Sequence, residues 1–136
     1  MARTFQGGCL CGASRYEARG EPINVRVCHC RLCQRAIGAA FNARVLMPID
    51  AVTISGPVGR FNSSPALARG FCQICGTALF SERTGGGVVG LTCGSLDEPA
   101  AFRPTAHMWT ASKQAWVPPP HGCLRHPVSG RSPRQG

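Results

Sequence analysis

The sequence predicts a mostly β domain with antiparallel sheets, and three observations support this fold class. First, a chain of 136 residues has the length of one domain that can bury a core. Second, short runs of strand-forming residues recur at close spacing and are separated by Gly, Pro, Asn and Ser. Third, helical patterns are scarce, and closely spaced strands with few helices between them favour antiparallel pairing.

Seven segments have the strand pattern, and two have a weak helical pattern. The predicted strands are residues 14–18, 24–28, 41–47, 51–55, 69–72, 77–81 and 87–92. We expect two helical turns in residues 31–40 and one in residues 95–102, where Ser95 or Asp97 would be the cap. Residues 118–136 have no periodicity and many Pro and Gly residues, so we expect an irregular tail there.

The chain is basic, with a formal net charge of +9. Phosphate neutralisation needs such a charge, but the arginines are spread along the chain and no long basic run occurs. An aromatic–basic RNA-binding signature is absent as well. We therefore expect a solvated basic surface, and we do not expect nucleic acid as a partner.

The apolar segments are short. None of them approaches the ~20 residues of a membrane span, so we expect no membrane association. The first residues, MARTFQGGCLCG, lack the apolar core of a secretory signal. The sequence therefore predicts a cytoplasmic protein, in which thiols stay reduced and clustered cysteines are metal ligands rather than disulfides.

The first and third cysteine groups have the pattern of metal knuckles. They occur in GGCLCGA and GFCQICGT and contain Cys9, Cys11, Cys72 and Cys75. Each second cysteine is followed by a glycine, Gly12 or Gly76, which permits the positive φ of a tight turn behind a metal. Together these cysteines would form a tetrahedral zinc site. The alternative is two unrelated buried cysteine pairs.

The middle cysteine group, VCHCRLC, contains Cys28, Cys30 and Cys33. On an extended segment, the first two side chains project to one side and His29 to the other. We therefore expect His29 to form a hydrogen bond on the opposite face rather than to bind the same metal. Cys33 would lie near the start of the short helix, where free N–H groups favour a thiolate.

Three protein ligands with one open position are typical of a catalytic zinc. A substrate thiol in the open position would be held as its thiolate, ready to attack a carbonyl carbon. The alternative is a closed structural site, in which Cys93, Cys123 or His107 supplies the fourth ligand.

The order of these motifs resembles the glutathione-dependent formaldehyde-activating enzyme family, which shares its domain with centromere protein V. The resemblance rests on GGCLCG, CHCRLCQRAIGAAF, GFCQICGTALF and GSLDEPAAFRPTAHMWTASKQAW, and it covers about residues 7–116. It implies an Mss4-like fold of small antiparallel sheets organised around two zinc ions. By the family pattern, Cys9, Cys11, Cys72 and Cys75 hold a structural zinc, and Cys28, Cys30 and Cys33 hold a catalytic one.

The resemblance also implies a function. It predicts a zinc-dependent carbon–sulfur lyase of the S-(hydroxymethyl)glutathione synthase type, with residues 1–117 as the catalytic domain and residues 118–136 as the tail. The expected partners are glutathione or another small thiol, and formaldehyde or another small carbonyl compound. The alternative is a zinc-stabilised module without enzymatic activity, which would carry a thiol or bind protein or nucleic acid.

Several further residues have possible roles. His107 is a candidate general acid for the nascent alkoxide, or else a packed histidine. Arg31 and Arg35 flank the middle cysteines. We hypothesise that one of them offsets thiolate charge or attracts a substrate carboxylate; the alternative is that both are simply solvated.

Residues outside the motifs have simpler expected roles. Trp109 and Trp116 are expected in the core or at the rim of the pocket. Cys93 is expected to be a small core residue and Cys123 an exposed thiol of the tail.

Overall fold

The computed structural model describes residues 3–118 and 122–128, which contain one α-helix and eleven strands. The strands are β1 (Thr4–Gly8), β2 (Arg15–Arg19), β3 (Asn24–Cys28), β4 (Asn42–Pro48), β5 (Val52–Ser55), β6 (Val58–Ser64), β7 (Leu67–Cys72), β8 (Ala78–Arg83), β9 (Val88–Thr92), β10 (Ala106–Met108) and β11 (Leu124–His126). The helices are α1 (Arg31–Ile37) and the 3₁₀ turns η1 (Ile49–Ala51), η2 (Cys93–Ser95), η3 (Pro99–Ala101) and η4 (Thr110–Ser112).

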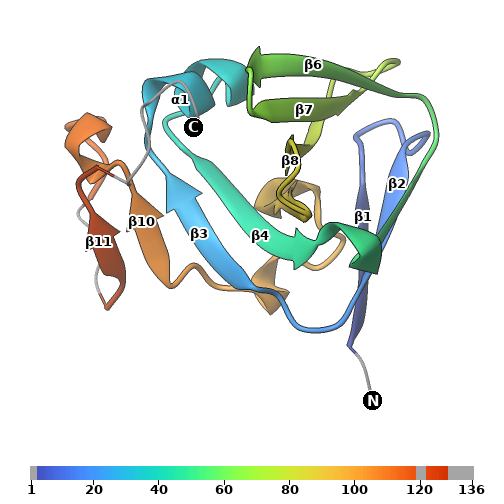
Figure 1. The fold of residues 1–136 in the computed structure, drawn as a ribbon, viewed down its shortest axis with the longest axis horizontal. Helices are drawn as coiled ribbons and strands as arrows, with labels where there is room; N and C mark the ends of the chain where they lie inside the picture. The colour runs from blue at the N-terminus through green and yellow to red at the C-terminus, as the bar shows by residue number, and fades with distance from the viewer. Residues whose placement is uncertain (1–2, 119–121, 129–136) are drawn as a thin grey trace.

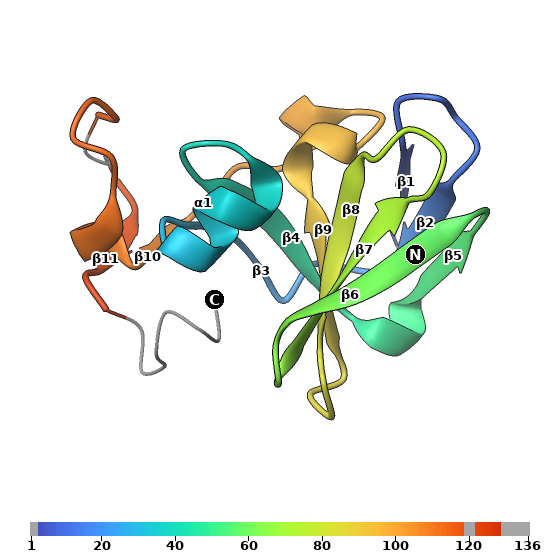
Figure 2. The same ribbon diagram turned by 90° about the horizontal axis from the view of Figure 1, so that it is seen from above.

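These strands form a small and a large sheet (Figures 1 and 2). The small sheet has the order β1-β2-β5, and the large one has the order β11-β10-β3-β4-β9-β8-β7-β6. All neighbouring strands pair antiparallel except β10, which runs parallel to both β3 and β11. The predicted mostly β fold with antiparallel sheets is therefore confirmed.

The main core lies where residues of the two sheets pack together. Tyr16 and Ala18 of β2 belong to the same buried cluster as Met47 of β4 and Leu91 of β9. The Tyr16 hydroxyl also lies 2.8 Å from Ser95 Oγ, so this polar group is satisfied inside the core. The cluster includes two cysteines of the knuckles, which places one candidate metal site at the edge of this core.

A second, smaller core surrounds the middle cysteine group. Cys28, Cys30 and Cys33 form one buried cluster with Trp109, and Leu32 and Met108 pack against it. Strand β10 brings Met108, the register partner of Cys28, and Trp109 directly follows this strand. The parallel addition of β10 to β3 therefore encloses the middle cysteines from a distant part of the sequence.

All seven predicted strands occur, with bounds that shift by a few residues. The predicted helix 31–40 is shorter, because Gly38 adopts a left-handed conformation with φ 71° and ends α1 after Ile37. Strands β1, β6, β10 and β11 were not predicted. The sequence of β1 ends in two glycines, and β6 is mostly polar and exposed, so neither segment has the apolar alternation of a buried strand.

The prediction of a capped helical turn at 95–102 is wrong in its cap and its extent. The only regular turn within it is η3, and no side chain caps it. The Asp97 carboxylate instead accepts two hydrogen bonds from Arg15, one of them at 3.0 Å, and this guanidinium lowers the pKa of Asp97. Ser95 Oγ donates to the Thr92 carbonyl rather than to a helix N–H group.

The Pro-rich segment differs from the predicted irregular tail in its described residues. Leu124–His126 form β11 at the edge of the large sheet, paired in parallel with Ala106–Met108. The rest of the predicted tail lies mostly outside the described residues. Within residues 3–118 and 122–128, no helix combines the length and apolarity that crossing a membrane requires.

A substitution in the turn after β5 would test how tightly the chain packs behind the first knuckle. Gly56 has φ +97°, and a Cβ there would lie 2.8 Å from Ser14 Cα, just behind Cys9 and Cys11. We expect Gly56→Ala to lower the free energy of unfolding by about 2–4 kcal/mol, because left-handed strain and a backbone clash add. The measurement is urea unfolding followed by circular dichroism.

Gly85 supplies the matched control for this substitution. It has φ +71°, but a Cβ there would meet nothing within 4 Å. Gly85→Ala therefore isolates the strain and should cost about 1–2 kcal/mol. Equal losses in the two variants would contradict the tight packing behind the knuckle.

Candidate metal centres

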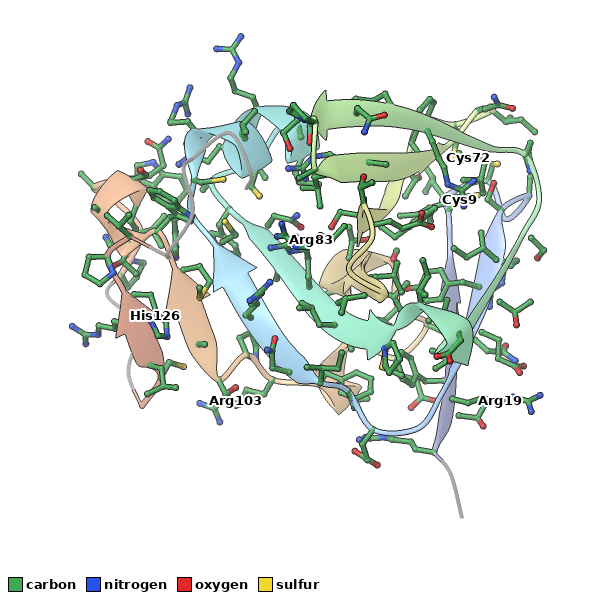
Figure 3. All side chains as sticks on the ribbon, in the orientation of Figure 1. Cys9, Arg19, Cys72, Arg83, Arg103 and His126 are labelled. Atoms are coloured by element: carbon green, nitrogen blue, oxygen red, sulfur yellow. The ribbon has the colours of Figure 1, made fainter. Side chains whose placement is uncertain are left out.

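The first and third cysteine groups come together between the two sheets. The turn from β1 to β2 supplies Cys9 and Cys11, and the turn from β7 to β8 supplies Cys72 and Cys75. Figure 3 shows Cys9 and Cys72 side by side. All four sulfur atoms lie within 4.8 Å of one another, and the distances from Cys11 Sγ to Cys9 Sγ and Cys72 Sγ are 3.6 and 3.8 Å. Zinc–sulfur bonds of about 2.3 Å in a tetrahedron require sulfur–sulfur distances of about 3.8 Å, so this group fits a zinc ion.

Hydrogen bonds to sulfur hold these knuckles in position. The N–H groups of Ser14 and Ile74 donate to Cys9 Sγ at 3.2 Å and to Cys72 Sγ at 3.4 Å. Thr77 Oγ1 lies 3.2 Å from Cys75 Sγ, and this contact, with the Thr77 backbone, lowers the pKa of Cys75 to about 5. A thiol with this pKa is a thiolate at neutral pH, the form in which cysteine binds metal.

The predicted glycine turns occur in both knuckles. Gly12 has φ +84° and Gly76 has φ +81°. The N–H groups of these glycines donate to the carbonyl groups of Cys9 and Cys72 at 3.2 and 2.8 Å, which closes each turn. The sequence pattern therefore indicated the local backbone correctly.

The middle group is a second, fully buried cluster. Cys28 ends β3, Cys30 caps α1, and Cys33 lies in its first turn. At most 1% of each residue is exposed, and the three sulfur atoms lie within 4.8 Å of one another. Cys33 thus lies near the start of the helix, as predicted, and its N–H group donates to the capping Cys30 Sγ at 3.3 Å.

The middle cluster offers three sulfur donors to a metal, and the described residues add no fourth ligand. Within the part of the chain that the structure describes, no further His, Cys, Asp or Glu ligand atom joins this cluster. The residues proposed for closing it lie elsewhere: Cys93 packs against the main core, and Cys123 Sγ donates to the Pro104 carbonyl at 3.4 Å. The donor set therefore fits a zinc ion with one position left for another ligand.

His29 projects away from the sulfur cluster, as predicted. It is fully buried, and its Nε2 lies 3.0 Å from Nδ1 of His107 in β10. The rings are stacked with centroids 5.2 Å apart. Burial lowers the pKa of His29 to about 4, and the charges of His107 and Lys113 act in the same direction. Burial also lowers the pKa of His107, so the geometry fits a neutral pair bridged by one N–H group.

A buried glutamine that the sequence analysis missed holds this cluster to the following segment. Gln34 Nε2 donates to the His29 carbonyl at 2.6 Å and to the Ser112 carbonyl at 3.0 Å. Its Oε1 accepts hydrogen bonds from Arg31 and Gln114. Both ends of the amide are therefore satisfied, which a buried amide requires. Nothing in the local sequence distinguishes this residue from an exposed helical glutamine.

The arginines near the sulfur cluster are not those that the sequence suggested. Arg31 and Arg35 are exposed, and Arg31 donates to Gln34. Arg69 of β7 is buried instead, and its Nη2 donates to Cys33 Sγ at 3.6 Å. Hydrogen bonds from Cys28 and Cys30 lower the pKa of Cys33, and the charges of Arg44 and Arg69 lower it further. Arg69 is far from Cys33 in sequence, so only the fold brings them together.

A cavity of about 220 Å³ lies beside Arg69, which links it to Cys33 Sγ, although none of the three cysteines is among its lining residues. Its walls come from α1 and from β4, β6, β7, β8 and β9. Ile37, Phe61, Phe71 and Phe80 are among its apolar lining residues. The side chain of Phe61 is half-exposed, so the cavity reaches the surface at β6.

The remaining predicted residues have mixed outcomes. Trp109 is buried against the middle cysteines, as expected, whereas 73% of Trp116 is exposed and it belongs to no core. Cys93 is half-buried against the main core, and burial raises the pKa of its thiol. Cys123 is half-buried rather than exposed.

The fold and the two cysteine groups define a β domain with two clusters that could hold metal ions, and a family model identifies the class. Residues 4–112 match the model described as glutathione-dependent formaldehyde-activating enzyme. This match covers most of the chain. The protein belongs to that family.

Two curated relatives are named accordingly. The chain is 33% identical over 82 residues to an uncharacterised lyase of Schizosaccharomyces pombe, covering 60% of each protein. It is 28% identical over 86 residues to a Phaeosphaeria nodorum protein named "Putative glutathione-dependent formaldehyde-activating enzyme", covering 57% of this chain and 45% of the relative. The chain thus spans less than two thirds of the length of both relatives.

A solved structure has the same fold. The crystal structure of a Rhodobacter sphaeroides protein aligns with a TM-score of 0.56 and 21% identity, over 68% of this chain and 87% of that protein. At this identity the likeness concerns the fold alone.

The two cysteine groups lead to a prediction on metal content. We expect two equivalents of bound metal in the wild type and one in Cys30→Ser, which should keep its circular dichroism spectrum. Cys72→Ser should lose the site that joins the sheets and with it much of the cooperative unfolding transition, because metal binding is coupled to folding. Plasma emission spectrometry and thermal unfolding measure both effects.

Cys123→Ser is the control, since Cys123 belongs to neither group. It should retain both equivalents. One equivalent or none in the wild type, purified under reducing conditions with metal supplied, would contradict the assignment of two centres.

Proposed function

We propose that the protein is a zinc-dependent carbon–sulfur lyase of the S-(hydroxymethyl)glutathione synthase type, which joins the glutathione thiol to formaldehyde. The observation that carries this proposal is the middle cluster: three buried sulfur donors and no fourth donor among the described residues. Family membership supports the choice of reaction. The first group, with four donors, would hold a structural zinc.

The reaction forms one bond from sulfur to carbon. The thiolate sulfur attacks the carbonyl carbon, the C=O π pair moves to oxygen, and the proton lost by the thiol ends on that oxygen. When zinc is bound at the middle cluster, it stabilises a thiolate at neutral pH and holds the sulfur in place. Because coordination also makes sulfur less nucleophilic, much of the rate gain must come from proximity and orientation.

The chain's own residues contribute position and environment. Cys28, Cys30 and Cys33 would hold the metal, with Cys30 fixed by its helix-capping hydrogen bond. Trp109 packs against them and excludes water from that side. The cavity beside Arg69 is the proposed place where the two substrates meet, because Arg69 both lines it and donates to Cys33 Sγ, and because it reaches the surface at β6.

A cellular compartment and a domain boundary can also be proposed for the protein. All nine cysteines are free thiols in the structure, which metal binding requires and a reducing compartment maintains. We propose that the protein is cytoplasmic and that residues 1–117 form its catalytic domain. The family match over residues 4–112 supports this boundary.

A rate comparison tests the enzymatic proposal. The metal-loaded wild type should form S-(hydroxymethyl)glutathione faster than the uncatalysed reaction, and Cys30→Ser should fall to the uncatalysed rate while keeping one metal equivalent. The readout is NMR exchange spectroscopy between free formaldehyde and the adduct, with Cys123→Ser as the active control. Equal rates in wild type and Cys30→Ser would refute the enzyme and favour a zinc-stabilised binding module.

The general-acid role of His107 is a separate hypothesis, and the geometry favours a positioning role. Met108 packs against the sulfur cluster, and side chains alternate along a strand, so His107 projects to the other face of β10. There its Nδ1 contacts His29, which lies between two of the cysteines. His107 would thus fix the loop that carries the cysteines.

We expect His107→Ala to weaken binding of the second metal equivalent and to leave the rate per bound metal within a few fold. The reason is that only the orientation of the cysteine loop is lost. Chelator competition and the NMR rate assay measure the two quantities on the same samples. A rate lower by about 10²-fold or more at full metal occupancy would instead support general-acid catalysis.

A further inference from the structure

Two arginines are buried close to the middle cysteine cluster without a carboxylate. Only 4% of Arg69 and 5% of Arg44 is exposed. Arg69 donates from Nε to Ser63 Oγ at 2.8 Å and from Nη2 to Cys33 Sγ at 3.6 Å, and Arg44 Nη1 donates to Ser81 Oγ at 3.1 Å. In residues 3–118 and 122–128, the ion pairs all belong to other arginines.

A buried guanidinium group needs a compensating negative charge, because the protein interior solvates a cation poorly. Hydroxyl partners supply dipoles but no charge. The sulfur cluster is the anionic group at hand. Arg69 contacts Cys33 directly, and Arg44 lies on the same face of the β3–β4 pair as Cys28, one diagonal position away, because Cys28 is the register partner of Asn42. The two arginines and the three cysteines therefore form one electrostatic unit.

The charges of this unit do not cancel when a divalent ion is bound. Three thiolates and one zinc ion carry a net charge of about −1, and two guanidinium groups change it to about +1. A neutral fourth ligand leaves this excess inside the protein. An anionic fourth ligand removes it.

The positive charge also faces the space where a ligand would arrive. Arg69 is a lining residue of the 220 Å³ cavity, among the side chains of Phe61, Phe71 and Phe80. In such apolar surroundings a charge is screened weakly and acts more strongly than at the surface. Arg69 thus connects the cavity with the sulfur cluster.

We propose that Arg44 and Arg69 are the residues that make the middle cluster accept an anionic ligand, a thiolate, in preference to a neutral one. This inference rests on the proposed function of that cluster as the open metal site. Both arginines are positioning residues, since they act through the cysteines and the charge of the site. The sequence analysis had assigned a related role to Arg31 or Arg35, which lie on the exposed face of α1.

The first experiment measures metal affinity in Arg69→Met, Arg69→Lys and Arg60→Met. Arg60 is the matched control, since it lies on the neighbouring strand β6 and forms a surface ion pair with Glu82. Competition with a fluorescent chelator should show one metal equivalent weakened by about 10–100-fold in Arg69→Met, as for other residues that orient metal ligands. Arg69→Lys should recover part of this loss because it keeps the charge.

The four-cysteine site is an internal control in the same molecule. Its affinity should not change in any of these variants. If Arg69→Met and Arg69→Lys weaken both equivalents together, the residue supports folding rather than the charge of one site, and the inference is overturned. An unchanged second equivalent in Arg69→Met overturns it as well.

The second experiment compares an anionic with a neutral ligand on the cobalt-substituted proteins. Mercaptoethanol would bind as a thiolate and imidazole as a neutral donor, and the visible spectrum of cobalt reports both without turnover. We expect Arg69→Met to weaken mercaptoethanol binding by about 10-fold or more and to leave imidazole binding within about 3-fold. Equal losses for both ligands would contradict charge selectivity.

These results separate the inference from the proposed reaction. If the wild type binds mercaptoethanol in an Arg69-dependent manner but does not accelerate adduct formation, the reaction is rejected and the role of Arg69 is upheld. If the wild type binds neither ligand at cobalt, there is no open position, and both the inference and the proposed reaction are overturned.

Discussion

The structure depends on the meeting of two cysteine knuckles between the sheets. Hydrophobic contacts join the sheets, and the turns that carry Cys9 and Cys72 add a junction made of sulfur atoms. A metal bound there, as we propose, would make this junction favourable, because four thiolates at these distances would otherwise repel one another. Metal binding of this kind contributes on the order of 10–16 kcal/mol, comparable to the whole stability of a small domain.

The second cluster has a different physical basis. Its cysteines lie on one short stretch, so they converge without help from a distant knuckle. What the fold adds is the enclosure: β10 pairs parallel to β3 and brings Trp109, and Gln34 connects α1 to the segment that follows β10. The two buried arginines complete this environment. The four-cysteine cluster thus connects the two sheets, whereas the three-cysteine cluster is enclosed by the segments around it.

Much of the architecture is readable from local sequence. Strand β3 occupies the predicted residues, because the pattern of NVRVC places Val25 and Val27 on the buried face. The knuckle glycines, Gly12 and Gly76, have the predicted positive φ. By contrast, β1 is a strand because Gly7 lets Tyr16 pack closely against it, and β11 exists because β10 offers it an edge. Such strands are defined by their neighbours, and their own sequences carry no signal.

The sequence alone determined the grouping of the cysteines and the direction of His29, because both follow from spacing along a few residues of extended or tightly turned chain. It determined the mostly β class for the same reason. Only the tertiary structure decided which charges surround the middle cluster. The strand segments that contain Arg44 and Arg69 have no distinctive sequence pattern. Their proposed role depends on contacts between distant residues, such as Arg69 and Cys33, which are 36 positions apart. Electrostatic partners are chosen by distance in space, which no local pattern records.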